Sequence, residues 1–261
     1  MPDDGPTYGD AVQWWQAAII ALAGLWAGLI NTVVGSGTLV TFPVLVALGY
    51  PPVTATTSNA IGLISGSVTG AVGYRGEWVG HGRRLAGYAV ASVLGAVGGT
   101  VLLLSLPADT FETIVPILVG ISVILVVVQP LLARRLRNRA AVDRRESPLL
   151  YVLIFLVGVY GGYFTAAQGI MLVGVMGLLL SDPLQRINGF KNTLTAVVNL
   201  VAGAIYAFVA PISWPVVAVL AVSSTVGGLL GASVGRRLSP AVLRGVIVVI
   251  GVIAVVHLLI K

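Results

Sequence analysis

The sequence predicts an all-α polytopic membrane protein made of two inverted repeats, each with about five helical segments. Three observations lead to this prediction. Hydrophobic residues fill 57% of the 261 positions and charged residues only 9%, whereas about a quarter of the residues in a soluble domain are charged. Apolar runs long enough to cross a hydrocarbon core of about 30 Å recur along the whole chain. The basic residues between these runs fall almost entirely on one side of the membrane.

Ten apolar segments, separated by helix breakers, account for nearly all of the chain. They are expected at 12–34, 37–49, 52–74, 83–106, 109–133, 148–166, 168–180, 184–210, 213–236 and 239–260. The second and the seventh are short, and at the helical rise of 1.5 Å per residue each reaches only about 20 Å. They hold the same place in each group of five. We therefore expect two short broken or re-entrant helices that meet near the membrane midplane.

The order of breakers in the two groups of five indicates an internal duplication. When Gly37 is aligned with Gly169, Pro51 falls on Pro183. One further inserted residue then sets Asn59 on Asn192. Because each group contains an odd number of segments, the second group must enter the membrane from the opposite side. The repeats are therefore predicted to be inverted.

The placement of charge predicts the topology in the cell membrane. If the N-terminus is outside, every basic residue except Lys261 lies on the cytoplasmic side. The residues left outside are mostly acidic, namely Asp3, Asp4, Asp10, Asp109 and Glu112. Both termini are then outside. The first dozen residues lack the positive region of a cleaved signal peptide, so the first apolar run is expected to remain in the mature protein.

Four regions follow from this topology. They are an extracellular tail (1–11), a first transmembrane repeat (12–133), a basic cytoplasmic linker (134–147) and a second, inverted repeat (148–261). The linker reads "RRLRNRAAVDRRES" and is interpreted as a solvated charge run that sets topology, with a lipid or regulatory site as the alternative.

Small and polar residues join a long apolar run to a short one in "NTVVGSGTLVTFP" (31–43) and "GGYFTAAQGIMLV" (161–173). Unwound backbone at membrane depth is tolerated only where it is buried in protein or lines a cavity. Interrupted segments at matching positions of two inverted halves indicate a central transport site. The residues predicted to bind substrate here are Gly35, Ser36, Gly37, Gln168 and Gly169. The alternative is close helix packing through small residues.

Polar residues also begin the helices that follow the short segments, in "ATTSNAIG" (55–62) and "INGFKNTLTA" (187–196). Helix N-termini favour anions through exposed N–H groups and the helix dipole. The residues predicted to bind substrate here are Thr57, Ser58, Asn59, Lys191 and Asn192. The alternatives are helix capping by the hydroxyls and snorkelling of Lys191 to the interface.

We hypothesise that the two asparagines donate amide hydrogen bonds to an oxyanion from two pseudo-symmetric sides, while Lys191 supplies the counter-charge. Arg186, at the cytoplasmic end of the same stretch, is expected to serve topology or substrate access. Asn199 is a further polar residue inside the apolar run that follows. Polar residues at membrane depth need partners or a function.

These stretches resemble a known family. "GLINTVVGSGTLVTFPVLVALGYPPVTATTSNAIG" and "VGVYGGYFTAAQGIMLVGVMGLLLSDPLQRINGFKNTLTAVVNLVAGAIYAF" are similar to the two signatures of the TauE/SafE sulfite exporter family. The resemblance extends over nearly the whole chain. It implies a transporter of sulfur-containing anions such as sulfite, thiosulfate, sulfoacetate or related organosulfonates.

The expected function is therefore export of such an anion by alternating access, without enzymatic activity. The expected partners are a small anionic substrate and membrane lipid, and not nucleic acid. No cofactor or metal is expected, because the chain has no cysteine and two histidines and its predicted core lacks an acidic cluster. All nine acidic residues fall in tails, loops or segment ends, so no buried carboxylate relay is available and the coupling ion is left open.

Two other functions have the same sequence features. An anion channel of the same architecture would also use inverted repeats with interrupted helices. A serine intramembrane protease would use Ser36 as its nucleophile, and it would need a histidine base within hydrogen-bond reach. The predicted topology places His81 in a cytoplasmic loop and His257 near the outer end of the last segment, so neither is well placed for that role.

Overall fold

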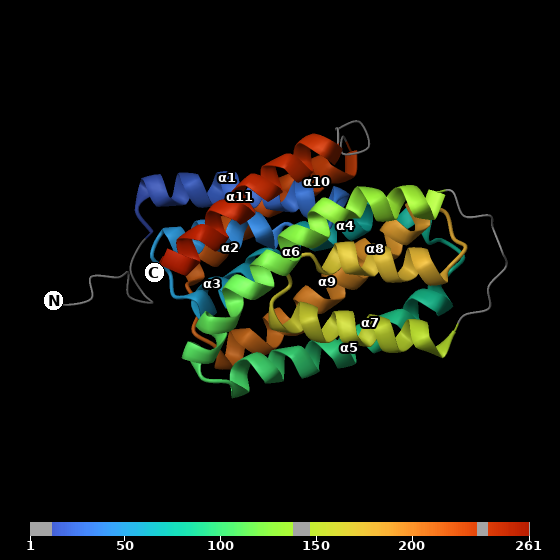
Figure 1. Ribbon diagram of the computed structural model, residues 1–261, viewed down its shortest axis with the longest axis horizontal. Helices are drawn as coiled ribbons and strands as arrows, with labels where there is room; N and C mark the ends of the chain where they lie inside the picture. The colour runs from blue at the N-terminus through green and yellow to red at the C-terminus, as the bar shows by residue number, and fades with distance from the viewer. Residues whose placement is uncertain (1–11, 138–146, 234–239, 261) are drawn as a thin grey trace.

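A computed structural model describes residues 12–137, 147–233 and 240–260, and this part of the chain is helical throughout, without a strand (Figure 1). The helices are α1 (Trp14–Val33), α2 (Thr38–Ala47), α3 (Pro52–Gly62), α4 (Ile64–Gly73), η1 (Arg75–Glu77), α5 (Gly82–Ser105), α6 (Ala108–Arg137), α7 (Pro148–Tyr163), α8 (Gln168–Leu179), α9 (Leu184–Val209), α10 (Trp214–Ser233) and α11 (Pro240–Ile260). The predicted tail 1–11 and residues 138–146 of the predicted linker lie outside the described residues.

Each of the ten expected segments contains a helix. The two short segments are α2, of 10 residues, and α8, of 12 residues. The third expected segment forms two helices, α3 and α4, which are separated at Leu63. The segment with which the predicted duplication aligns it, α9, is continuous over 26 residues. Gly62 and Gly66 flank this break and lie directly against α10, where a Cβ on either would collide with Leu220 or Ser224.

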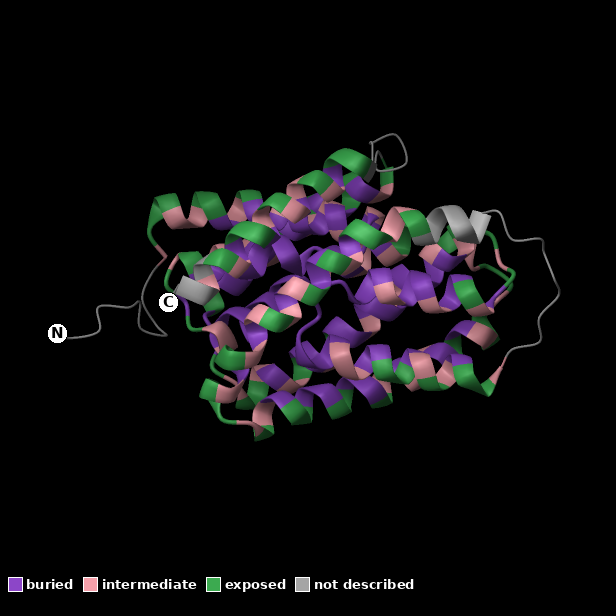
Figure 2. Ribbon diagram, in the orientation of Figure 1, coloured by how far each residue is buried: buried purple, intermediate pink, exposed green. Residues whose placement is uncertain are grey.

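Five helices of the described chain are long and apolar enough to cross a membrane, judged by length and composition. They are α1, α5, the stretch Ala108–Leu131 of α6, α9 and α10. Exposed residues lie on the outward faces of the bundle and buried residues on the inner elements (Figure 2). The outward faces carry large apolar side chains such as Leu22, Phe208 and Val222. Such a surface suits lipid, and the protein is a multi-pass membrane protein.

Helices from distant parts of the chain pack in pairs. α1 lies along α10, α5 along α7, and α6 along α11. Glycines bring the first two pairs together: Gly28 faces the backbone of α10 at Ser224, and Gly95 faces the backbone of α7 at Phe155. Close backbone approach through small residues is the usual way in which membrane helices pack.

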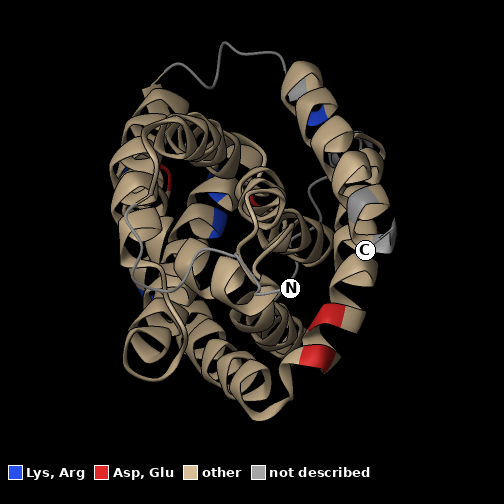
Figure 3. Cartoon of the chain, turned by 90° about the vertical axis from the view of Figure 1, so that its left-hand side faces the viewer, with Lys and Arg blue, Asp and Glu red and all other residues tan. Residues whose placement is uncertain are grey.

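The bundle has two chemically different ends. α1 starts and α11 finishes at the same end, whereas α6 finishes and α7 starts at the other (Figure 1). The second of these we call the basic end, because it carries Arg75 of η1, Arg83 and Arg84 in the first turn of α5, and Arg186 in the first turn of α9. Figure 3 looks from the opposite end and shows acidic positions on the near rim.

Candidate functional site

The two interrupted segments meet at their glycine turns. The backbone N–H of Gly169 donates to the carbonyl of Gly35 at 3.1 Å. A Cβ on Gly35 would lie 2.8 Å from Gly169 Cα, and a Cβ on Gly169 would lie 2.6 Å from Gly35 Cα. Gly35 also has a φ of 98°, which favours glycine. We call this contact the glycine crossing; neither of its positions can hold a larger residue without a backbone shift.

The bodies of the two short helices point away from the crossing. α2 packs against α1, α3 and α11, whereas α8 packs against α7, α9 and α6. Their first turns start at the crossing, because Gly37 is the N-cap of α2 and Gln168 is the first residue of α8. The positive ends of two helix dipoles are thereby placed close to each other.

Lys191 of α9 lies beside the glycine crossing and is fully buried. Its Nζ donates to the carbonyl oxygens of Asn31 at 3.0 Å and Thr32 at 2.9 Å. These carbonyls belong to the last turn of α1, where helical N–H partners are missing and the dipole is negative. A Cβ on Gly169 would lie 2.9 Å from Lys191 Cδ, so the crossing also makes room for this side chain. The buried ammonium excludes the snorkelling alternative.

The charge of Lys191 is not balanced by a carboxylate in the described part of the chain, where the ion pairs found are both made by Asp182. A buried charge costs several kcal/mol unless it is paired or hydrogen-bonded. Two of the three ammonium N–H groups are used on carbonyls. The third remains available to an acceptor that is not part of the protein.

Asn192 and the residues that flank the crossing add further polar groups. The Asn192 amide donates to Thr32 O at 3.3 Å, so it shares this carbonyl with Lys191. Ser36 and Gln168 are each 1% exposed. The Ser36 hydroxyl and both polar atoms of the Gln168 amide have no hydrogen-bond partner among the described residues. Since buried polar groups are usually hydrogen-bonded, these groups are available to a ligand or to water.

Strained backbone positions the Gln168 side chain. Thr165 and Ala167, which lead into α8, have φ values of 66° and 58°. Residues other than glycine rarely adopt this conformation. A Cβ on Gly161 of α7 would lie 2.5 Å from the Gln168 side-chain carbonyl carbon, so the amide fills the space that this glycine leaves. Strain of this kind clusters at functional sites.

Asn59 is bound within the first half of the chain. Its Nδ2 donates to Thr38 Oγ1 at 3.1 Å, and its Oδ1 accepts from Thr41 Oγ1. Both partners belong to α2. The amide therefore joins α3 to α2, and it does not contact the element to which Asn192 is bonded.

Thr57 and Ser58 join α3 to the α9–α10 connection at the end opposite the basic end. Thr57 Oγ1 donates to Pro211 O at 2.6 Å, and Ser58 Oγ accepts from the N–H of Ser213 at 2.9 Å. The predicted site residues thus form three groups: the glycine crossing with Lys191 and Asn192, the Asn59 cluster, and this junction.

Four further polar residues near Lys191 were not among the predicted site residues, namely Asn31, Ser67, Thr195 and Asn199. Ser67 Oγ of α4 accepts from Asn31 Nδ2 at 3.1 Å and from Asn199 Nδ2 at 2.9 Å. Thr195 lies on α9 between Lys191 and Asn199. A signal was present in the sequence, since the spacing of four between Lys191, Thr195 and Asn199 places them on one helix face.

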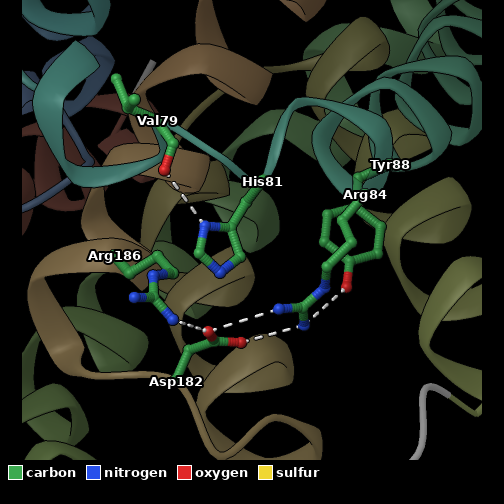
Figure 4. Close-up of polar contacts among 6 residues, drawn as sticks. All are labelled: Val79, His81, Arg84, Tyr88, Asp182 and Arg186. Atoms are coloured by element: carbon green, nitrogen blue, oxygen red, sulfur yellow. Dashed lines mark hydrogen bonds and ion pairs between the residues drawn. The ribbon is translucent and has the colours of Figure 1, made fainter.

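An ion-pair cluster connects the two halves at the basic end (Figure 4). Asp182, before α9, accepts from Arg186 at 2.6 Å and from Arg84 of α5 at 2.9 Å. Arg84 also donates to Tyr88 OH at 3.4 Å. Burial alone would raise the pKa of Asp182, but hydrogen bonds from Arg186 and Arg84 and their positive charges lower it below its ordinary value. Figure 4 also shows His81 of the same end, whose Nδ1 lies 3.3 Å from Val79 O.

Apolar helices that could cross a membrane, interrupted helices that meet at their turns, and a buried lysine beside them are features of membrane transporters. The chain belongs to the TauE/SafE sulfite exporter family, whose model matches residues 20–258.

Curated relatives cover most of the chain. A "Probable membrane transporter protein" of Haemophilus influenzae is 24% identical over 234 residues, 89% of this chain and 90% of the relative. A second, "Probable membrane transporter protein ORF9" of Sinorhizobium sp, is 24% identical over 250 residues, 93% and 92% of the two chains. "Probable membrane transporter protein YfcA" of Escherichia coli K12 is 27% identical over 223 residues, 84% and 79%.

Proposed function

We propose that this protein exports a sulfur-containing anion, such as sulfite, thiosulfate or a small organosulfonate, by alternating access around Lys191. The observation that supports this proposal is a fully buried lysine beside the glycine crossing, with no carboxylate partner in the described residues. An anion would compensate the ammonium charge, and in return the ammonium would hold the anion.

The groups around the crossing suit an oxyanion. The third N–H of Lys191, the free hydroxyl of Ser36 and the free amide of Gln168 can all donate to anion oxygens. The first turns of α2 and α8 add the positive ends of their dipoles. Meanwhile the negative end of α1 is neutralised by Lys191 and Asn192.

The proposed architecture is a pair of inverted repeats, with both termini outside and the basic end in the cytoplasm. This architecture is supported by helix pairs that recur when each helix is replaced by its counterpart in the other half. The pair α1 and α10 corresponds to α7 and α5, the pair α1 and α2 to α7 and α8, and the pair α2 and α11 to α8 and α6. The basic end carries the cluster of arginines that the charge rule assigns to the cytoplasm.

In this proposal each end of the transporter opens by breaking one set of contacts between the halves. The basic end would open when Asp182 releases Arg84 of α5. The opposite end would open when Thr57 and Ser58 release the α9–α10 connection. Both sets are formed in the described structure, so in this proposal it represents a closed intermediate of the cycle.

The test is a counterflow assay in proteoliposomes that contain the full chain. Sulfite, thiosulfate, sulfoacetate and sulfate are each supplied with and without a pH gradient. We expect saturable uptake of at least one of the first three anions, accelerated by the same anion on the opposite side. Flux that neither saturates nor accelerates would favour the channel alternative, and the absence of flux for all four anions would overturn the proposal.

A further inference from the structure

One face of α9 carries polar side chains for two helical turns beyond Lys191. Thr195 and Asn199 follow at steps of four residues, which places them on the same face. Asn31 connects this face to Lys191, because its carbonyl accepts from Lys191 Nζ and its side-chain amide donates to Ser67 Oγ. Ser67 in turn accepts from Asn199. A continuous polar path therefore starts at the buried ammonium and runs between α9 and α4.

Hydrogen-bonding groups are left unused along this path. Thr195 is 3% exposed and Asn199 is 1% exposed, yet Thr195 Oγ1 and Asn199 Oδ1 have no partner among the described residues. Either orientation of the Asn199 amide leaves one of its polar atoms free. Ser67 Oγ accepts two N–H groups, so its own O–H proton is available to donate.

Thr195 differs from several other helical threonines, although Thr54 and Thr56 of α3 share its lack of a partner. A helical threonine often donates to the carbonyl four residues earlier. Thr193 does so to Gly189 O at 3.1 Å, as do Thr32 to Gly28 O and Thr100 to Ala96 O. The Thr195 hydroxyl does not make this bond. Since a buried hydroxyl without a partner is costly, we expect it to meet a ligand.

The spacing of these groups indicates the shape of that ligand. At the helical rise, Thr195 lies about 6 Å and Asn199 about 12 Å along α9 from Lys191. A compact oxyanion held by Lys191 would fill only the space within hydrogen-bond distance, about 3 Å, of the ammonium. A molecule with a second oxygen-bearing group could reach Thr195 and Ser67 as well.

We infer that Thr195, Ser67 and Asn199 form a neutral second subsite, which binds the far polar group of a two-headed organic anion whose sulfonate is held at Lys191. This inference rests on the proposed function, and it assigns specificity to residues outside the predicted site. With the Asn199 amide as described, the subsite donates through the Thr195 and Ser67 hydroxyls and accepts at Asn199 Oδ1. With the amide flipped, Ser67 donates to Oδ1 and the Asn199 N–H₂ group faces the ligand instead. Either state offers two donors, so the subsite takes a carboxylate, a hydroxyl or a carbonyl group.

The test measures the affinity of the full-length protein for two probes that carry the same sulfonate group. Methanesulfonate has the sulfonate alone, whereas sulfoacetate adds a carboxylate two atoms away. The variant Thr195→Val removes only the hydroxyl and keeps the shape of the side chain. Thr193→Val is the matched control on the same helix, because its hydroxyl is already bonded to Gly189 O.

We expect wild type to bind sulfoacetate more tightly than methanesulfonate. Thr195→Val should weaken sulfoacetate binding by about tenfold, as the loss of a hydrogen bond to a charged group does, and should change methanesulfonate binding by less than about twofold. Thr193→Val should leave both affinities as in wild type. Thr195→Ser, which restores a hydroxyl, should recover sulfoacetate binding.

The outcomes separate this inference from the proposed function. If wild type binds both probes and Thr195→Val loses affinity for neither, or for both equally, the second subsite is wrong while anion transport stands. If wild type binds neither probe but transports sulfite, the two-headed substrate is wrong. If wild type binds and transports none of these anions, the proposed function itself fails and the subsite fails with it. Should Thr195→Val not fold, Ser67→Ala supplies the same comparison.

Discussion

The regions around Asn59 and around Lys191, which the predicted duplication aligns, differ in their hydrogen bonding. Asn59 is satisfied by two threonines of its own half. Lys191 and Asn192 reach into the other half, onto the last carbonyls of α1. The Asn59 amide has no unused atom, although Thr54 and Thr56 on the same helix have unpartnered hydroxyls, as do Ser36 and Thr195 nearer to Lys191. Residues that the predicted duplication aligns can therefore differ in the elements to which they are hydrogen-bonded.

The two ends of the bundle show the same divergence. At the basic end the halves are joined by charges, through Asp182, Arg84 and Arg186. At the opposite end they are joined by neutral hydrogen bonds of Thr57 and Ser58. Ion pairs respond to salt and to strong acid, whereas hydroxyl contacts do not. The conditions that open one end should thus leave the other unchanged.

The largest effect is expected where both halves touch. Gly35→Ala and Gly169→Ala each force a Cβ to within 3 Å of the facing backbone, and Gly35 also has a positive φ. Each variant should lose about 2–5 kcal/mol of stability or fail to fold. Gly120→Ala is the control, because no heavy atom lies within 4 Å of its added Cβ. Thermal unfolding in detergent measures the difference; wild-type midpoints for both crossing variants would show that the turns do not pack in this way.

A smaller effect, of a different kind, is expected at Asn59. Asn59→Ala leaves the hydroxyls of Thr38 and Thr41 without their partner, which should cost about 1–3 kcal/mol of stability. Substrate affinity should stay within about twofold of wild type, since no unused group lies at this amide. Thermal unfolding and equilibrium binding are measured on the same preparation. Lost affinity with unchanged stability would restore the hypothesis that both asparagines bind the anion.

The smallest effect is expected at Asp182. Because its pKa is lowered in the folded protein, its contribution to stability is fully present above the ordinary carboxyl pKa and disappears as the pH falls through the lowered value. Asp182→Asn should therefore be less stable than wild type by a constant amount between pH 5 and 8, and the difference should shrink in stronger acid. The arginines are about one-third exposed, so the difference is small and decreases with salt. Equal stability of the two proteins at pH 7 would contradict a structural role for this cluster.

The sequence predicted the helices well, but it could not supply the hydrogen-bond partners of the proposed site residues. Apolar runs and breakers located every segment, because lipid permits few alternatives to helices. The division of the third segment at Leu63 was missed, since it depends on how closely α10 approaches Gly62. Lys191 and Gln168 were recognised as polar residues in unusual places. Their partners could not be predicted, because the last turn of α1 is brought to Lys191 only by the packing of distant helices.

The central claim is that Lys191 binds the transported anion, and equilibrium binding of labelled sulfite or sulfoacetate to purified protein tests it most directly. Lys191→Met keeps the length of the side chain and removes its charge. Replacing a buried charge by an apolar group often preserves folding, and thermal unfolding verifies this for the variant. We predict saturable wild-type binding that weakens as salt rises, and a loss of at least about thirtyfold in Lys191→Met. Wild-type affinity in a folded Lys191→Met protein would contradict the account and would leave Lys191 only the role of capping α1.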